Sequence, residues 1–294
     1  MRKMLFKNKC LPSFLILFCS GLLFASGCKN TGQHSPEGYA LDKPHRTELG
    51  KFLNEISGIC FLVEDSSLLA VSDSKEKVVQ IDIRSKKLKD YTGRVINSGS
   101  DVEDVIKIDT SIFLLMSKGI LVEVPQKSKD TAGVKTYDLG LSGANDFETL
   151  YYDASAAGLI LLCKTCAREK GTGVRTAYRF DLRSRTFDDG VFFTISRAQI
   201  KTLLKNSDAK FEPSAAAIHP PSRRLFILSS AGHLLVVTDT RGQVVEAYDL
   251  DPEVFPQAEG IAFAPNGDMF ISNEGKNGPP TLLRFTYLPK GKKK

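Results

Sequence analysis

Five glutamates recur through this 294-residue chain, each in a short motif that leads into an apolar run. They are Glu55, Glu103, Glu148, Glu212 and Glu259, and successive members are 48, 45, 64 and 47 residues apart. Carboxylates brought together in a partly desolvated place repel one another unless they take up protons or bind a cation. Calcium takes about six to eight oxygen ligands, so a carboxylate set without sulfur or imidazole suits it better than zinc. The chemistry to expect is calcium binding, or proton transfer by a free glutamate, if the fold brings these residues together.

The spacing of the glutamates indicates a repeated unit of strands. In each copy polar or turn-forming residues separate the first apolar run from a second one, and a third run follows. In the first copy the turn is Glu64–Ser67, the second run is Leu68–Ser72 and the third is Val78–Ile83. Short apolar runs joined by such turns are β-hairpins. Units of about 45 residues are typical of propeller blades. The sequence therefore predicts an all-β fold, a five-bladed β-propeller over residues 38–289, with an ordinary β-sandwich of accidental spacing as the alternative.

A fourth, weaker strand in each unit is marked by an aromatic residue. Those that lie between consecutive glutamates are Tyr91, Tyr137, Phe187 and Tyr248. Tyr39 stands before the first glutamate, and only three strands are readable after the last one. We therefore expect the strand around Tyr39 to complete the last blade and close the ring, because closure protects sheet edges that an open array would expose.

The first strand of every propeller blade lines the central channel, so residues at its start point toward one another around the channel mouth. This placement predicts a calcium site formed by the five glutamates, whereas no catalytic residue can be assigned. The alternative is that some of these glutamates cap strand backbones or pair with lysines. Lys118 and Lys164 follow the second strands of units two and three and fall near the same mouth, although plain surface lysines are the simpler interpretation.

The amino terminus has the features of a targeting segment. Four basic residues precede an apolar run over 11–24, which small residues end just before Cys28. The run is short for a transmembrane helix. Residues 1–27 resemble a bacterial lipoprotein signal, whose cleavage would leave Cys28 as a lipidated first residue, 28–37 as a tether and the protein on a membrane of the bacterial cell envelope. An uncleaved anchor and ordinary secretion are the alternatives.

The charge of the chain argues against a nucleic-acid partner. The formal charge of +6 includes four basic residues of the signal and four lysines of the tail 290–294, which leaves about −2 for the propeller. The tail is a solvated basic end, with weak attraction to anionic lipid as the alternative. We expect a monomer.

The remaining features point to structure more than to chemistry. No nucleophile elbow or phosphate loop is present, and the four histidines have no metal-ligand spacing. We expect Cys60 and Cys163 to be small core residues, with a Cys163–Cys166 disulfide as the alternative. One helix is predicted over Ser196–Lys205, as an insertion that covers one end of the ring and packs through an apolar stripe.

The motifs together carry a family resemblance. Glu55-Ile-Ser-Gly-Ile, the Asp-x-Glu motifs at 101 and 146, Glu212-Pro-Ser and Gln257-Ala-Glu259-Gly-Ile resemble the SdiA-regulated (YjiK-like) family of bacterial cell-envelope proteins, distantly NHL-like. The resemblance implies a five-bladed β-propeller with calcium at a shared site, and it suggests phosphoester hydrolysis for some relatives. We therefore expect a lipid-anchored, calcium-binding module for a ligand or partner; the alternative is a calcium-dependent phosphoesterase, phytase-like, or a lactonase.

Overall fold

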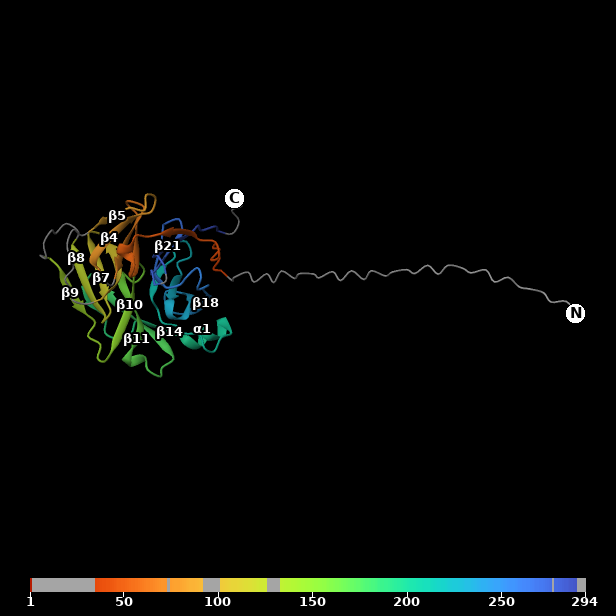
Figure 1. Cartoon of the computed structure of the whole chain (residues 1–294). Coiled ribbons are helices and arrows are strands. Elements are labelled where there is room, and N and C mark those ends of the chain that lie inside the picture. The colour runs from red at the N-terminus through yellow and green to blue at the C-terminus, as the bar shows by residue number, and fades with distance from the viewer. Residues whose placement is uncertain (2–34, 73–74, 92–100, 126–132, 277, 290–294) are drawn as a thin grey trace. The chain divides into compact units, whose positions relative to one another are not determined.

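The structure is a computed structural model that describes Met1 and residues 35–72, 75–91, 101–125, 133–276 and 278–289. These residues form five sheets, four with four strands and one with five (Figure 1). Blade 1 consists of β2 (Ile56–Leu62), β3 (Ser67–Ser72), β4 (Lys75–Asp82) and β5 (Leu88–Asp90). Blade 2 consists of β6 (Val102–Ile108), β7 (Ser111–Met116), β8 (Ile120–Pro125) and β9 (Lys135–Asp138). All neighbouring strands within a blade are antiparallel, as expected for runs joined by short turns.

The later blades follow the same order, with one elaboration. Blade 3 has β10 (Asn145–Asp153), β11 (Gly158–Cys166) and β12 (Val174–Asp181), and its outer strand is split into β13 (Thr186–Phe187) and β14 (Phe193–Ser196). Blade 4 consists of β15 (Ala215–Ile218), β16 (Leu225–Ser229), β17 (Leu234–Thr238) and β18 (Val244–Asp249). Blade 5 combines β19 (Ala258–Phe263), β20 (Met269–Asn273) and β21 (Thr281–Phe285) with β1 (His45–Glu48). The predicted five-bladed propeller is confirmed.

The hydrophobic core is divided among the spaces between blades. Five clusters of buried side chains are present, and each joins one blade to the next around the ring, including blade 5 to blade 1. The inner strands β2, β6, β10, β15 and β19 each contact the inner strands of both neighbouring blades. Because every blade buries both faces of its sheet, its central strands are almost continuously apolar instead of alternating.

Ring closure is confirmed, but the closing strand is not the one around Tyr39. Strand β1 pairs with β21, from His45 opposite Arg284 to Glu48 opposite Thr281. The segment before it cannot run straight, since Tyr39 N–H donates to Pro36 O and Lys43 N–H donates to Ala40 O in two turns. Tyr39 is instead a buried core residue.

The insertion helix is confirmed, while its predicted place over one end of the ring is wrong. Helix α1 (Arg197–Leu204) is capped by Ser196, whose hydroxyl accepts a hydrogen bond from Gln199 N–H. Its Ile200 is buried in the cluster between blades 3 and 4, and the helix packs against the outer strand β18. The predicted apolar stripe is therefore only partly used, because Leu203 is 47% exposed.

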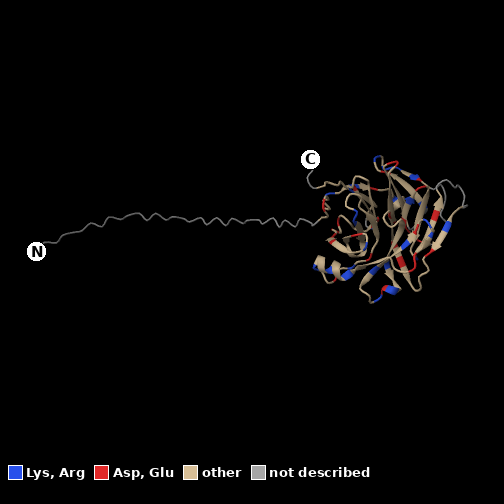
Figure 2. Cartoon of the chain, turned by 180° about the vertical axis from the view of Figure 1, so that it is seen from behind, with Lys and Arg blue, Asp and Glu red and all other residues tan. Residues whose placement is uncertain are grey.

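Three short 3-10 helices complete the described elements: η1 (Lys51–Leu53), η2 (Ala167–Glu169) and η3 (Ser230–Gly232). Lys/Arg and Asp/Glu residues are interspersed along the blades in Figure 2. No helix in the described part of the chain is both long and apolar enough to cross a membrane. The predicted signal 1–27, the lipidation residue Cys28 and the basic tail 290–294 lie outside the described residues.

Candidate functional site

Three of the five predicted glutamates line one cavity. The carboxylates of Glu148, Glu212 and Glu259 come from blades 3, 4 and 5 and border a space of about 320 Å³. Glu103 is half-buried and Glu55 is exposed, and neither lines this cavity. The arrangement is thus an arc of three carboxylates, which we call the mouth cavity, and not a ring of five.

A β-bulge explains why glutamate is directed out of the sheet at this place. Phe147 pairs with Cys163 and Thr149 with Leu162, so Glu148 is an extra residue with no partner in the ladder. The same irregularity places Glu103 in blade 2 and Glu259 in blade 5 at bulge positions of their strands, between two residues that pair with the next strand. Bulges re-aim side chains and are common beside functional sites. Glu212 lacks this device, since it precedes β15 and its N–H donates to Ser229 Oγ at 2.9 Å.

Lys164 enters the mouth cavity from the strand that faces Glu148. Its ammonium forms an ion pair with Glu148 Oε1 and lies 3.9 Å from Asp146 Oδ2. Lys164 is itself a bulge residue, because Asp146 pairs with Thr165 and Phe147 with Cys163. The interpretation of Lys164 as a plain surface lysine is therefore wrong, whereas Lys118 is exposed and lies outside the cavity.

A disulfide brackets Lys164. Cys163 and Cys166 are joined, so the alternative of a disulfide is correct and the preference for Cys163 as an unpaired core thiol is wrong. Cys60 is a free, half-buried cysteine, and burial raises the pKa of its thiol to about 11. The cross-link closes a short loop around Lys164 and restricts the backbone from which its side chain reaches Glu148.

The electrostatics of the mouth cavity favour an added positive charge. Burial raises the pKa of Glu148 to about 7, and the charge of Glu259 adds to the effect, while the hydrogen bond from Lys164 opposes it. Burial also raises the pKa of Glu259 to about 7, assisted by the charge of Glu274 and opposed by Ser230 and Lys164. Glu148 Oε2 is buried and has no hydrogen-bond partner. Two lysines, Lys164 and Lys276, line the cavity with three glutamates, so one negative charge is left uncompensated when all five side chains are ionised.

Glu212 is held at the edge of a buried ion-pair network that the sequence did not reveal. Glu169 Oε2 accepts from Arg175 Nη1 at 2.8 Å, and Arg175 Nη2 lies 4.0 Å from Glu212 Oε1. Glu169 Oε1 also accepts from Thr176 N–H at 2.6 Å. Arg175 and Glu169 are both almost fully buried, so their ion pair holds the Arg175 guanidinium in place. Glu212 interacts with this guanidinium only at a longer distance.

Asp104 is a second acidic residue that has a structural role. It is buried, its Oδ1 accepts from Val105 N–H and its Oδ2 accepts from Leu150 N–H of blade 3, each at 2.8 Å. Burial raises the pKa of this carboxyl well above its usual range, although both backbone hydrogen bonds act in the opposite direction. A Cβ on Gly58 would lie 1.9 Å from Asp104 Oδ1, so glycine at position 58 leaves room for the bridge. The acidic motif at 101–104 thus supplies a bridge between blades 2 and 3.

The donor chemistry of the mouth cavity suits a hard cation. Besides the three carboxylates, Ser214, Ser230 and Gln257 contribute hydroxyl and amide oxygens to the lining. In the described residues, the only three Cys, His, Asp or Glu ligand atoms within 4.8 Å of one another belong to Cys163, Cys166 and Glu169, where the sulfurs are already joined. The glutamates therefore do not converge to bonding distance here, and Lys164 stands among them as a cation.

Comparison with known proteins establishes the family. A model of the family described as SdiA-regulated matches residues 35–282. The chain belongs to the SdiA-regulated family. This SdiA-regulated propeller gave no significant match among curated protein sequences.

Solved structures similar to the SdiA-regulated chain share its fold. A glucose dehydrogenase is 12% identical with a TM-score of 0.54, covering 83% of this chain and 100% of that chain. Regucalcin from Agrobacterium tumefaciens strain C58, described as a calcium-binding protein, is 12% identical with a TM-score of 0.51, covering 86% and 95%. A luciferin-regenerating enzyme is 11% identical with a TM-score of 0.51, covering 84% and 96%. At these identities the similarity concerns the propeller fold alone.

Proposed function

We propose that this protein is a lipid-anchored component of the bacterial cell envelope whose propeller binds calcium in the mouth cavity and serves as a binding module for a ligand or partner. The observation that carries the proposal is the buried, unpartnered Glu148 Oε2 beside Glu259, two carboxyls whose pKa values are both raised to about 7. Such groups gain most from a cation, because a cation relieves both their mutual repulsion and their loss of hydration.

Lys164 acts in this proposal as an internal cation that calcium replaces. Its ammonium offers one charge and three donors, whereas calcium offers two charges and accepts about six to eight oxygens. Glu148, Glu212 and Glu259 would hold the ion, with Gln257, serine hydroxyls and water as further oxygen donors. Lys164 must then leave Glu148, so calcium binding changes the position of one side chain at the mouth.

The disulfide supports a location outside the cytoplasm. Disulfides form and persist in oxidising compartments such as the bacterial periplasm and are rare in the cytosol. The Cys163–Cys166 bond therefore agrees with export of the chain, and lipidation of Cys28 supplies the membrane attachment in this proposal.

A metal-dependent hydrolase of phosphoesters or lactones is the second candidate, because a raised pKa near 7 suits a general base. Glu259 has such a pKa and borders the same cavity as Lys164. Calcium would polarise the substrate, and Glu259 would take a proton from the attacking water. We rank this candidate second because no proton-transfer partner for Glu259 is evident: His233 lines the cavity, but no hydrogen bond or ion pair joins it to Glu259 among the described residues.

Calcium-dependent unfolding tests the proposal. After chelation, the full-length protein in detergent should gain about 2.7 kcal/mol of unfolding free energy when calcium reaches about 100 times its dissociation constant. Glu148→Gln and Glu259→Gln should each reduce this gain. Glu55→Gln is the matched control, because Glu55 occupies the same place in its motif but is exposed and outside the cavity. An equal effect of all three substitutions, or no calcium effect at all, would contradict the assignment of the site.

A further inference from the structure

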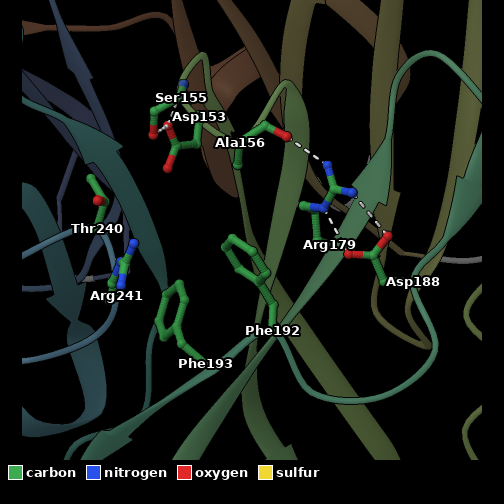
Figure 3. A pocket seen from close by; sticks show the side chains of 9 residues that line it. All are labelled: Asp153, Ser155, Ala156, Arg179, Asp188, Phe192, Phe193, Thr240 and Arg241. Carbon is green, nitrogen blue, oxygen red and sulfur yellow. Dashed lines mark hydrogen bonds and ion pairs between the residues drawn. The ribbon is translucent and has the colours of Figure 1, made fainter.

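A second cavity, of about 630 Å³, lies between blades 3 and 4 (Figure 3). It is lined by Asp153 at the end of β10, by Phe192 just before β14 and Phe193 at its start, and by Thr240 and Arg241 in the β17–β18 turn. Asp153 ends β10, whereas Glu148 lies five residues earlier in the same strand. This inter-blade cavity is therefore separate from the mouth cavity and shares no lining residue with it.

The split outer strand of blade 3 creates this space. Strand β13 pairs with Phe180 and Asp181 of β12, and β14 pairs with residues 174–177. Asp188 N–H still donates to Arg179 O and Phe192 N–H to Ala177 O, so residues 189–191 leave the ladder between them. Arg179 fixes the departing chain through two hydrogen bonds to Asp188, at 2.7 and 3.1 Å. On the other side, a Cβ on Gly242 would lie 2.5 Å from the Phe193 ring, so a glycine is needed for the blade 4 turn to pack this closely. Both walls are built by specific contacts.

Two opposite charges face the cavity without an ion-pair partner. Asp153 is 1% exposed, and its Oδ1 accepts from Ser155 N–H at 2.8 Å and from Ser155 Oγ at 2.6 Å. In Figure 3 its other oxygen points away from Ser155, on the side where Arg241 lies. Within the described part of the chain, neither Asp153 nor the Arg241 guanidinium takes part in an ion pair. Arg179, by contrast, is neutralised by Asp188 and Asp181.

Aromatic surface lies beside these charges. The Phe192 ring is 37% exposed, and its centroid is 5.6 Å from that of Phe193 in a tilted pair. Figure 3 shows both rings directed into the cavity. Asp153 has already lost its water on folding, so a cationic group that reaches its second oxygen is favoured, while the exposed Arg241 guanidinium can pair with an anionic group at the rim. A ligand with both charges and an apolar group satisfies all three features.

We propose that the inter-blade cavity binds a small zwitterion, an amino acid with an aromatic or apolar side chain. Its ammonium group pairs with Asp153, its carboxylate pairs with Arg241, and its side chain covers Phe192 and Phe193. Arginine is suited to this role because its planar guanidinium binds a carboxylate through two parallel hydrogen bonds. This site goes beyond the calcium-binding function and does not depend on it.

Titration calorimetry of the full-length protein in detergent and a calcium chelator tests the site, with three probes. L-phenylalanine carries both charges, 3-phenylpropanoate lacks the ammonium, and 2-phenylethylamine lacks the carboxylate. We expect L-phenylalanine to bind with a dissociation constant of about 1 mM or lower, and each analogue to bind at least about tenfold more weakly. No binding of L-phenylalanine in this range, or equal binding of the three probes, would overturn the proposal.

Substitution at the cavity rim locates the binding. Arg241→Gln should weaken L-phenylalanine binding by at least about tenfold and should leave binding of 2-phenylethylamine, which has no carboxylate, unchanged. Arg241 is exposed and unpaired, so this change should not affect folding. Arg223→Gln is the control, since Arg223 is an exposed arginine in another turn of blade 4 and does not line the cavity. Equal affinities for L-phenylalanine in wild type and Arg241→Gln would refute the assignment.

Discussion

Two carboxyl groups in the mouth cavity should make the metal-free protein less stable as pH rises. The pKa values of Glu148 and Glu259 are raised from 4.5 to about 7. Between these values the folded protein binds more protons than the unfolded chain, so the unfolding free energy falls as pH increases. The favourable contribution is fully present below about pH 4.5 and is lost as pH rises through about 7.

The size of the effect follows from the shift. A rise of about 2.5 units at about 1.36 kcal/mol per unit corresponds to about 3 kcal/mol for one carboxyl group. The charge of Glu259 is part of the cause at Glu148. The two contributions therefore overlap, and the pair should account for less than twice this amount.

Urea denaturation in a chelator at pH 5 and pH 8 provides the assay. Other groups also titrate, since burial lowers the pKa of His219 to about 4 and stability is lost from this residue as pH falls. The difference between variant and wild type removes that background. Glutamine carries no charge at either pH, so Glu148→Gln and Glu259→Gln should each gain about 2 to 3 kcal/mol relative to wild type between pH 5 and pH 8. Glu55→Gln should show the same change in unfolding free energy between pH 5 and pH 8 as wild type. If Glu148→Gln and Glu259→Gln also show that same change, the pKa values of the cavity carboxyls are not raised in the folded protein.

Three further predictions concern Lys164, the disulfide and the buried residue Tyr39. Lys164→Met should raise calcium affinity by about tenfold or more, because it removes the ammonium that competes with calcium for Glu148. Lys118→Met should leave calcium affinity unchanged. Isothermal titration with calcium tests both variants, and a loss of affinity in Lys164→Met would contradict the prediction. Reduction of Cys163–Cys166 should lower the unfolding free energy by about 2 kcal/mol, which is the loss of loop entropy expected for a loop of about four residues. Denaturation with and without a phosphine reductant measures the difference, and an unchanged unfolding free energy would refute the prediction. Tyr39→Ala should lower the unfolding free energy by about 3 to 5 kcal/mol, since Tyr39 is 9% exposed and contacts His219, Phe226 and Tyr287. Tyr152→Ala should lower it less, because Tyr152 is 37% exposed. Equal melting temperatures of the two variants would count against a structural role of Tyr39.

The sequence predicted the strands well because their signals are local. Apolar runs separated by turn residues, repeated at the period of a blade, mark the inner three strands of every blade. The closing strand was displaced by a few residues because Tyr39 resembles the aromatic residues of the outer strands. In the structure the turns at Pro36–Tyr39 and Ala40–Lys43 interrupt that segment, and pairing begins at His45.

The candidate site was harder to predict because it depends on irregular pairing. Bulges at Glu148 and Lys164 bring these side chains together, and a bulge has no period that a single sequence reveals. The repeat gave five equivalent glutamates, but each blade uses its own partners, so Glu55 remains exposed and Glu212 lies near Arg175. The spacing of Cys163 and Cys166 allowed the disulfide as an alternative, yet only the strand geometry brings the two sulfurs together.

The most direct test of calcium binding in the mouth cavity is a crystal structure of the protein with calcium, with anomalous scattering used to identify the ion. We predict an anomalous peak bounded by the carboxylates of Glu148, Glu212 and Glu259, coordinated by oxygen atoms, with the Lys164 ammonium withdrawn from Glu148. Fully occupied calcium elsewhere on the protein, or a mouth cavity in which Lys164 stays paired with Glu148 at saturating calcium, would contradict the proposal.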